Sequence, residues 1–176
     1  DRRGAAWALF FQTIIAAQDL ANPARSDALA AEGLAIRRAI GDKRGIAYSL
    51  HLEGEGALYA GEFARASQLY GESLALFREV GDTYGTSLSL AMTAEAAYAT
   101  ADYERAGRLG RECLKVNDEL GQRRGAGTTL ELLGRLAHAR GEEHAARALF
   151  AQALALLDDA GDRWALARCI ESIAAL

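Results

Sequence analysis

The chain has 176 residues and a mass of 18.8 kDa, the size of one ordinary domain. Its 39 Ala and 25 Leu far outnumber its 2 Val and 7 Ile, and it has a single Pro, so the composition predicts an all-α fold. The net charge is −4 and the 20 basic residues are spread along the chain, which argues against direct contact with DNA or RNA.

The longest uncharged run, residues 4–18, is shorter than the roughly 20 apolar residues that a membrane-spanning helix needs. Because Arg2 and Arg3 precede it, the run could also fit a secretory signal, but the Asp-Arg-Arg-Gly start resembles later repeat elements, so we assign it to the fold. Cys113 and Cys169 are too few for a disulfide framework or a zinc site. We therefore expect a cytoplasmic protein without metal or cofactor, and a chain that is a piece of a longer one.

Four glycines mark a repeat. Gly41, Gly81, Gly121 and Gly161 are each 40 residues apart, and Asp or Gln follows each of them. A fixed period between about 20 and 50 residues is typical of solenoids and repeat arrays. We therefore predict a single array with units at 1–41, 42–81, 82–121 and 122–161, followed by a lone helix at 162–176.

Each unit reads as two helices joined by a tight turn. In the first unit, Pro23 stands at the hairpin turn where Phe63 and Tyr103 stand later. In the second, the break is at Gly61-Glu62. In the third, Asp82 is a helix N-cap, Ala101-Asp102 separates the two apolar stretches, and Gly121 suits the left-handed position that ends a helix. In the fourth, the break is at Gly141-Glu142, and the last stretch holds only the first helix of a fifth unit.

The pattern within a unit resembles the tetratricopeptide repeat (TPR), which places small and large residues at set offsets along a helix pair. The fourth unit carries it in Leu130, Leu133-Gly134, Ala137, Gly141, Ala146, Phe150, Ala153 and Leu154. The second carries it in Leu50, Gly54, Ala57, Gly61, Phe63, Ala66, Tyr70 and Leu74, and the third departs from it at Ala94 and Gly110. The resemblance implies a right-handed superhelical solenoid of α-α hairpins, with Gly54 and Gly134 at the close contact between the two helices of their units.

The usual unit has about 34 residues, and a unit of 40 implies longer helices. Forty-residue units with Gly-Asp-x-x-Gly at the joint look like the arrays of large bacterial LuxR-type (STAND) transcriptional regulators, and similar units occur in animal adaptors and kinesin light chains. This resemblance implies a sensor or interaction segment that binds a peptide, a partner protein, a small effector or neighbouring domains of the parent chain. The alternative is a free-standing adaptor protein.

In the family, the first helix of each unit lines the concave face where ligands bind. Projected onto this chain, the first unit offers Trp7, Phe10 and Ile14. The later units place these residues in the groove: Tyr48, His51, Glu55, Tyr59, Glu95, Tyr98, Glu131, Arg135 and His138. Aromatic rings interleaved with carboxylates suit a peptide with basic and apolar side chains.

Chemistry by this chain is not expected. His51 and Glu55 are four residues apart and His138 could approach them, but no third ligand stands at metal spacing. Gly54-Glu-Gly56 lacks the third glycine of a dinucleotide loop, and no nucleophile motif is present, so we predict no catalytic residue. Cys113 occupies a small-residue position and is expected to be buried. Apolar residues near both ends, such as Phe11 and Ile170, predict end-to-end self-association.

Overall fold

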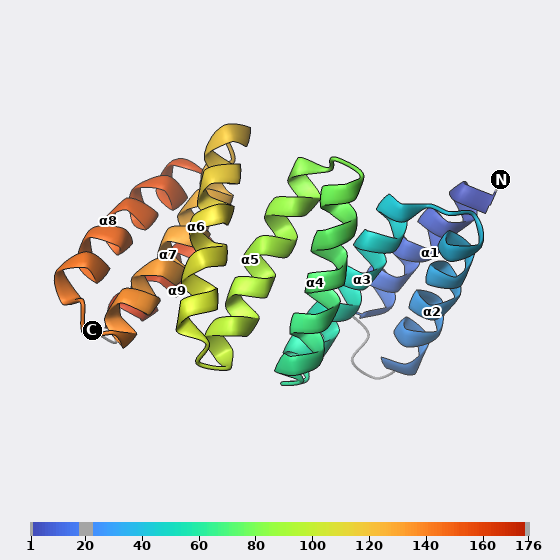
Figure 1. The fold of residues 1–176 in the computed structure, drawn as a ribbon, viewed down its shortest axis with the longest axis horizontal. Coiled ribbons are helices and arrows are strands. Elements are labelled where there is room, and N and C mark those ends of the chain that lie inside the picture. The colour runs from blue at the N-terminus through green and yellow to red at the C-terminus, as the bar shows by residue number, and fades with distance from the viewer. Residues whose placement is uncertain (1, 18–22, 175–176) are drawn as a thin grey trace. The chain divides into compact units, whose positions relative to one another are not determined.

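The computed structural model describes residues 2–17 and 23–174, and within them the fold is all-α, an array of helical hairpins without strands (Figure 1). The helices are α1 (Arg2–Ala17), α2 (Pro23–Ala39), α3 (Lys43–Tyr59), α4 (Phe63–Glu79), α5 (Thr83–Ala99), α6 (Tyr103–Leu120), α7 (Arg123–Ala139), α8 (Glu143–Asp159) and α9 (Arg163–Ala174). No helix of the described residues is long and apolar enough to cross a membrane.

The helix boundaries follow the predicted period. Lys43, Thr83, Arg123 and Arg163 each begin a helix, and the predicted breaks at residues 61–62, 101–102 and 141–142 are confirmed. Pro23 is the first residue of α2, where its missing N–H costs nothing. The helix α6 ends at Gly121, whose φ of 65° is left-handed, as the sequence predicts.

Ala101 departs from the glycine pattern at the hairpin turns. It has a φ of 59°, whereas Gly61 and Gly141 occupy the equivalent turns with φ of 75°. A side chain in this left-handed region crowds the backbone, because the Cβ atom approaches the carbonyl oxygen. The α5–α6 turn is therefore the strained one of the three.

The chain divides into two compact parts, residues 1–85 and 86–176. In the first part, α1 pairs with α2, α3 pairs with α4, and α2 packs on α3. In the second part, α7 and α8 form a closely packed hairpin, α6 packs on α7, and α9 lies against both α7 and α8. Figure 1 shows the antiparallel course of α3 with α4 and of α7 with α8.

Within a hairpin, a glycine on the first helix receives an aromatic ring from the second. The Tyr70 ring of α4 lies against Gly54 of α3, and the Phe150 ring of α8 lies against Gly134 of α7. Both rings are buried. The predicted close contact at the two glycines is therefore confirmed, and any larger residue there would collide with a ring.

The hairpin of α5 and α6 is packed differently because it has no such ring. Ala94 and Gly110 stand where the other hairpins have glycine and an aromatic residue. Leu133 of α7 fills the space over Gly110, with its Cδ2 3.0 Å from the position of a Cβ atom there. Ala94 joins a buried cluster with Ala97, Ala106, Leu132 and Leu136, so α7 completes this core.

A second set of glycines lies where one unit meets the next. Gly45, Gly85 and Gly125 each face a buried side chain of the preceding second helix, namely Arg37, Phe77 and Asn117. Each of these three side chains precedes its glycine by eight residues. The glycines are needed because the large side chain occupies the space that a Cβ atom would take.

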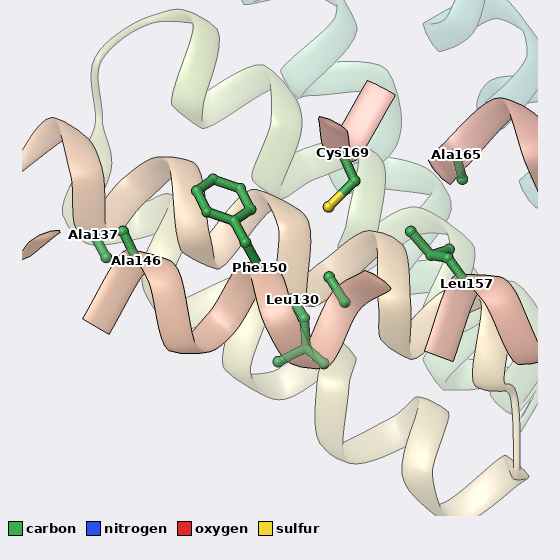
Figure 2. Close-up of a cluster of buried hydrophobic side chains, with 8 residues drawn as sticks. Leu130, Ala137, Ala146, Phe150, Leu157, Ala165 and Cys169 are labelled. Carbon is green, nitrogen blue, oxygen red and sulfur yellow. The ribbon is translucent and has the colours of Figure 1, made fainter. Parts of the chain in front are cut away.

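At the last joint the equivalent pair is an alanine and a leucine. Ala165 and Leu157 take the two positions, and both belong to a buried cluster formed by α7, α8 and α9. Figure 2 shows this cluster, with Phe150 and Leu157 projecting from α8 and Cys169 from α9. Cys113 is also fully buried, as the sequence predicts, and burial raises the pKa of its thiol.

Candidate functional site

The nine predicted groove residues all lie on the first helix of a hairpin. Those of the first compact part are on α3, and those of the second are on α5 and α7. The two groups belong to different compact parts of the chain. Within each group, some side chains are exposed and others form internal contacts.

The end of α3 carries the most exposed of these side chains. Tyr59 is 91% exposed, and Glu55, one turn earlier, is 43% exposed at its side chain. Desolvation by its surroundings raises the pKa of the Glu55 carboxyl. An aromatic ring and a carboxylate are thus presented together on one face of α3.

His51 lies deeper on the same helix. It is 9% exposed, its ring centroid is 5.2 Å from that of Tyr70, and its Nε2 is 3.8 Å from Glu55 Oε1. Burial lowers the pKa of His51 to about 4, so the imidazole is neutral at pH 7. Beneath it, the buried Tyr70 hydroxyl has no hydrogen-bond partner among the described residues. His51 therefore acts as a packing residue under Glu55, not as an exposed groove residue.

Tyr48 is part of the packing between α1, α3 and α4. Its ring lies edge-on to Phe77 at 4.7 Å between centroids, and the rings of Trp7 and Phe10 are 6.2 and 6.4 Å away. Its hydroxyl donates to Asp82 Oδ2 at 3.4 Å, and the side chain is half-buried.

Trp7 and Phe10, predicted for the groove in the first unit, surround a buried arginine. The Arg37 guanidinium is 5.1 Å from the centroid of each ring and donates to Ser49 Oγ at 2.5 Å. Ile14 is 37% exposed. The Trp7 and Phe10 rings thus help to hold a buried cation by cation–π contacts.

In the second part, Arg135 is the centre of a chain of charges. It donates to Glu95 Oε1 at 2.5 Å, its Nε is 2.8 Å from Glu131 Oε1, and its guanidinium lies 4.6 Å from the Tyr98 ring centroid. The two carboxylates raise the pKa of Arg135 and outweigh the desolvation that would lower it. Arg135 therefore contacts three of the other four predicted residues of this part.

Glu131 itself is 1% exposed, and α9 supplies its remaining partners. Arg168 Nη2 donates to Glu131 Oε2 at 3.2 Å, and Ser172 Oγ donates to Oε1 at 2.7 Å. Glu131 thus links two adjacent first helices. Arg168 and Ser172 were not identified from the sequence. A signal for them was present, because a carboxylate buried between helices needs hydrogen-bond donors, and the next unit is where they can come from.

His138 lies apart from this chain of charges. Its Nδ1 is 3.0 Å from Glu143 Oε1, at the turn between α7 and α8, and both side chains are partly exposed. Within residues 2–17 and 23–174, no group of three His, Cys, Asp or Glu side chains is placed to hold a metal ion. The described polar groups thus form ion pairs and packing contacts.

Comparison with known proteins gives a fold relationship. No family model matches the chain, and no curated protein matches it. The crystal structure of BtubC (BKLC) from P. vanneervenii is similar, with a TM-score of 0.60 and 15% sequence identity over 97% of this chain and 89% of that chain. At this level of identity the similarity concerns the fold alone, which the two chains share.

Proposed function

We propose that this chain is a tetratricopeptide-type scaffold that binds a peptide segment of a partner protein, with α3 carrying a principal contact surface. The observation that carries the proposal is the exposure of Tyr59. This side chain, at the end of α3, is 91% exposed and so is not packed into the core of the described structure. Exposed tyrosine is favourable at interfaces because it buries a large area with little loss of side-chain entropy.

The chemistry of the surface indicates the kind of peptide. Glu55 places a carboxylate one turn from Tyr59, so a basic side chain beside an apolar one in the peptide would meet both. In the second part, Glu95 and Glu131 neutralise the charge of Arg135. The contact that this part can provide to a peptide is therefore the partly exposed ring of Tyr98.

We further propose that the scaffold serves as the sensor or interaction segment of a multidomain bacterial transcriptional regulator. The support is the 40-residue unit with Gly-Asp at the joint, as in Gly41-Asp42 and Gly161-Asp162. The sequence that flanks this region in the parent gene tests the regulator proposal. We expect a P-loop sequence before the region and a helix-turn-helix sequence after it. A reading frame that ends near Leu176 with neither motif would leave the adaptor as the better proposal.

Peptide binding is tested by selecting binders from a displayed library of random linear peptides and measuring the affinity of a selected peptide by titration calorimetry. The double variant Tyr59→Ala with Glu55→Gln should weaken binding at least about tenfold, since it removes an aromatic contact and a charge. Tyr84→Ala is the matched control, because Tyr84 is also an exposed tyrosine, at 49%, but lies outside the predicted surface. Equal affinity in all three proteins, with the helical circular dichroism retained, would overturn the assignment of the surface.

A further inference from the structure

Two arginines converge over one glycine in the second compact part. Arg111 Nη1 and Arg140 Nη2 lie 3.4 and 3.7 Å from the position that a Cβ atom would take at Gly107, so at most about 7 Å separates the two nitrogens. Arg111 comes from the same helix as Gly107, one turn later, and Arg140 comes from the end of α7. Both side chains are exposed, and neither arginine is among the predicted groove residues.

The contact between the two helices fixes Arg140 in this position. Its Nη2 donates to the backbone carbonyl of Tyr103, in the first turn of α6, at 2.9 Å. One hydrogen bond leaves four of the five guanidinium N–H groups available. Gly107 carries no side chain between the two guanidinium groups, and it is itself buried.

No carboxylate neutralises this pair within the described residues. Several other arginines of the same part form ion pairs, as Arg123 does with Asp159 and Arg168 with Glu131. Glu143 is close to Arg140 in sequence but contacts His138 instead. Since the chain has 24 acidic and only 20 basic residues, two neighbouring cations without an acid stand out. Their mutual repulsion is relieved by an anion between them.

We propose that Arg111 and Arg140, with Gly107 between them, form an oxyanion site that takes a phosphoryl group or a side-chain carboxylate of a bound peptide. Planar guanidinium groups bind such oxyanions with two parallel hydrogen bonds, and paired arginines are a common means of recognising phosphorylated or acidic segments. This site goes beyond the proposed function, because its ligand chemistry is anionic whereas the α3 surface suits a basic peptide.

Titration of the ¹⁵N-labelled chain with inorganic phosphate tests the site directly. We expect saturable shifts of the Gly107 and Arg140 amide resonances, and each of Arg111→Gln and Arg140→Gln should weaken binding about tenfold. Arg163→Gln is the matched control. Arg163 is an exposed arginine that begins α9, about 25 Å from Arg140 at the opposite end of the 17-residue α8. Shifts that do not saturate, or that are unchanged in the double variant Arg111→Gln with Arg140→Gln, would overturn the proposal.

A third variant keeps the test independent of folding. Gly107→Glu places a carboxylate four residues before Arg111, in the favourable orientation for a helix ion pair, at a position where a Cβ atom meets no closer atom than 3.4 Å. This variant should have a higher melting temperature than the unsubstituted chain, and it should no longer bind phosphate. Unimpaired phosphate binding in this variant would contradict the site.

The source of the oxyanion is distinguished by parallel titrations with a phosphoserine peptide, its unphosphorylated form and a version with Asp in place of phosphoserine. Tighter binding of the phosphorylated peptide assigns a phosphoryl ligand, and equal binding of the phosphorylated and Asp peptides assigns a carboxylate ligand. In both cases the double variant Arg111→Gln with Arg140→Gln must lose the interaction. Binding of a single-stranded oligonucleotide in preference to all three peptides would overturn the assignment to a peptide.

Discussion

The ring of Phe77 lies directly against the backbone of Gly85, in the space where any other residue at position 85 would carry its side chain. Phe77 is fully buried and packs edge-on against Tyr48, so it cannot move aside without disturbing a second ring. The fit between one unit and the next therefore depends on a glycine inside a helix, where glycine is otherwise unfavourable.

Gly85→Ala should destabilise the chain by about 1–3 kcal/mol, because the overlap with the Phe77 ring outweighs the gain in helix propensity. Urea unfolding followed by circular dichroism measures the change. Gly71→Ala in α4 is the matched control, since no atom lies within 4 Å of its Cβ position and the substitution should stabilise by up to about 1 kcal/mol. Equal effects at both positions would contradict the proposed role of Phe77.

The turn between α5 and α6 predicts a change in the opposite direction. Ala101 has a φ of 59°, and Ala101→Gly should stabilise the chain by about 1 kcal/mol by relieving the contact between Cβ and the backbone. The matched control is Gly141→Ala, at the equivalent turn with a φ of 75°, which should cost a similar amount. Thermal unfolding of the two variants should give shifts of opposite sign, and a loss of stability in Ala101→Gly would contradict the strain.

The buried carboxylate of Glu131 is expected to contribute strongly to stability. Glu131→Ala leaves a cavity and removes the shared acceptor of Arg135, Arg168 and Ser172, so we expect a loss of about 3 kcal/mol in the free energy of unfolding. Glu119→Ala is the control: its ion pair with Lys115 is exposed and 3.9 Å long, and its loss should change stability by less than about 1 kcal/mol. A change at Glu131 as small as that at Glu119 would show that the network is not stabilising.

The sequence predicted the helices well because their boundaries depend on local chemistry. Gly121 ends α6 in a left-handed conformation and Asp102 caps it by accepting from the Arg105 amide, and both effects involve residues close in sequence. The resemblance to a known repeat likewise identified the contact of Gly54 with the second helix. Its partner ring, Tyr70, stands at a fixed offset within the same unit.

The candidate site was less predictable because it depends on contacts between units. Glu131 stands at a groove position by register, yet Arg168 and Ser172 are about one repeat away, and only packing of α9 on α7 buries it among them. His51 has the same register as Glu131, but it is buried by the Tyr70 ring of its own hairpin. Equivalent positions are therefore buried by different neighbours, and those neighbours decide which polar contacts each side chain makes.

The buried His51 predicts a loss of stability in acid. Its pKa is about 4 in the folded chain against an ordinary 6.5, so the unfolded state binds more protons between these values and stability falls as the pH is lowered through them. The maximum effect is about 3 kcal/mol. The raised pKa of Glu55 acts in the opposite sense, because the folded state then binds the extra proton.

The contribution of His51 is therefore best measured in the Glu55→Gln background, by urea unfolding at pH values between 7 and 4. His51→Gln should flatten the decline in stability on acidification, whereas His144→Gln, at an exposed histidine, should leave it unchanged. A pH profile that is identical with and without His51 would show that its burial does not persist in solution.

Self-association is the final expectation, and the register of α9 gives its physical basis. Ile170 is equivalent to Leu50, Leu90 and Leu130, which are 4%, 0% and 5% exposed, yet Ile170 is 57% exposed because no second helix covers α9 among the described residues. On α1, Phe11 and Ile15 are also largely exposed, at 58% and 69%. Apolar surface of this kind favours association.

Light scattering should therefore show a molar mass of the chain that rises with protein concentration. Ile170→Glu should reduce the rise, because it places a charge in the apolar contact. Ala167→Glu is the matched control, since it adds the same charge at an exposed position of α9 that carries no large apolar side chain. A constant monomer mass over the whole concentration range would refute the expectation, and equal effects of the two substitutions would assign the association to net charge rather than to the face centred on Ile170.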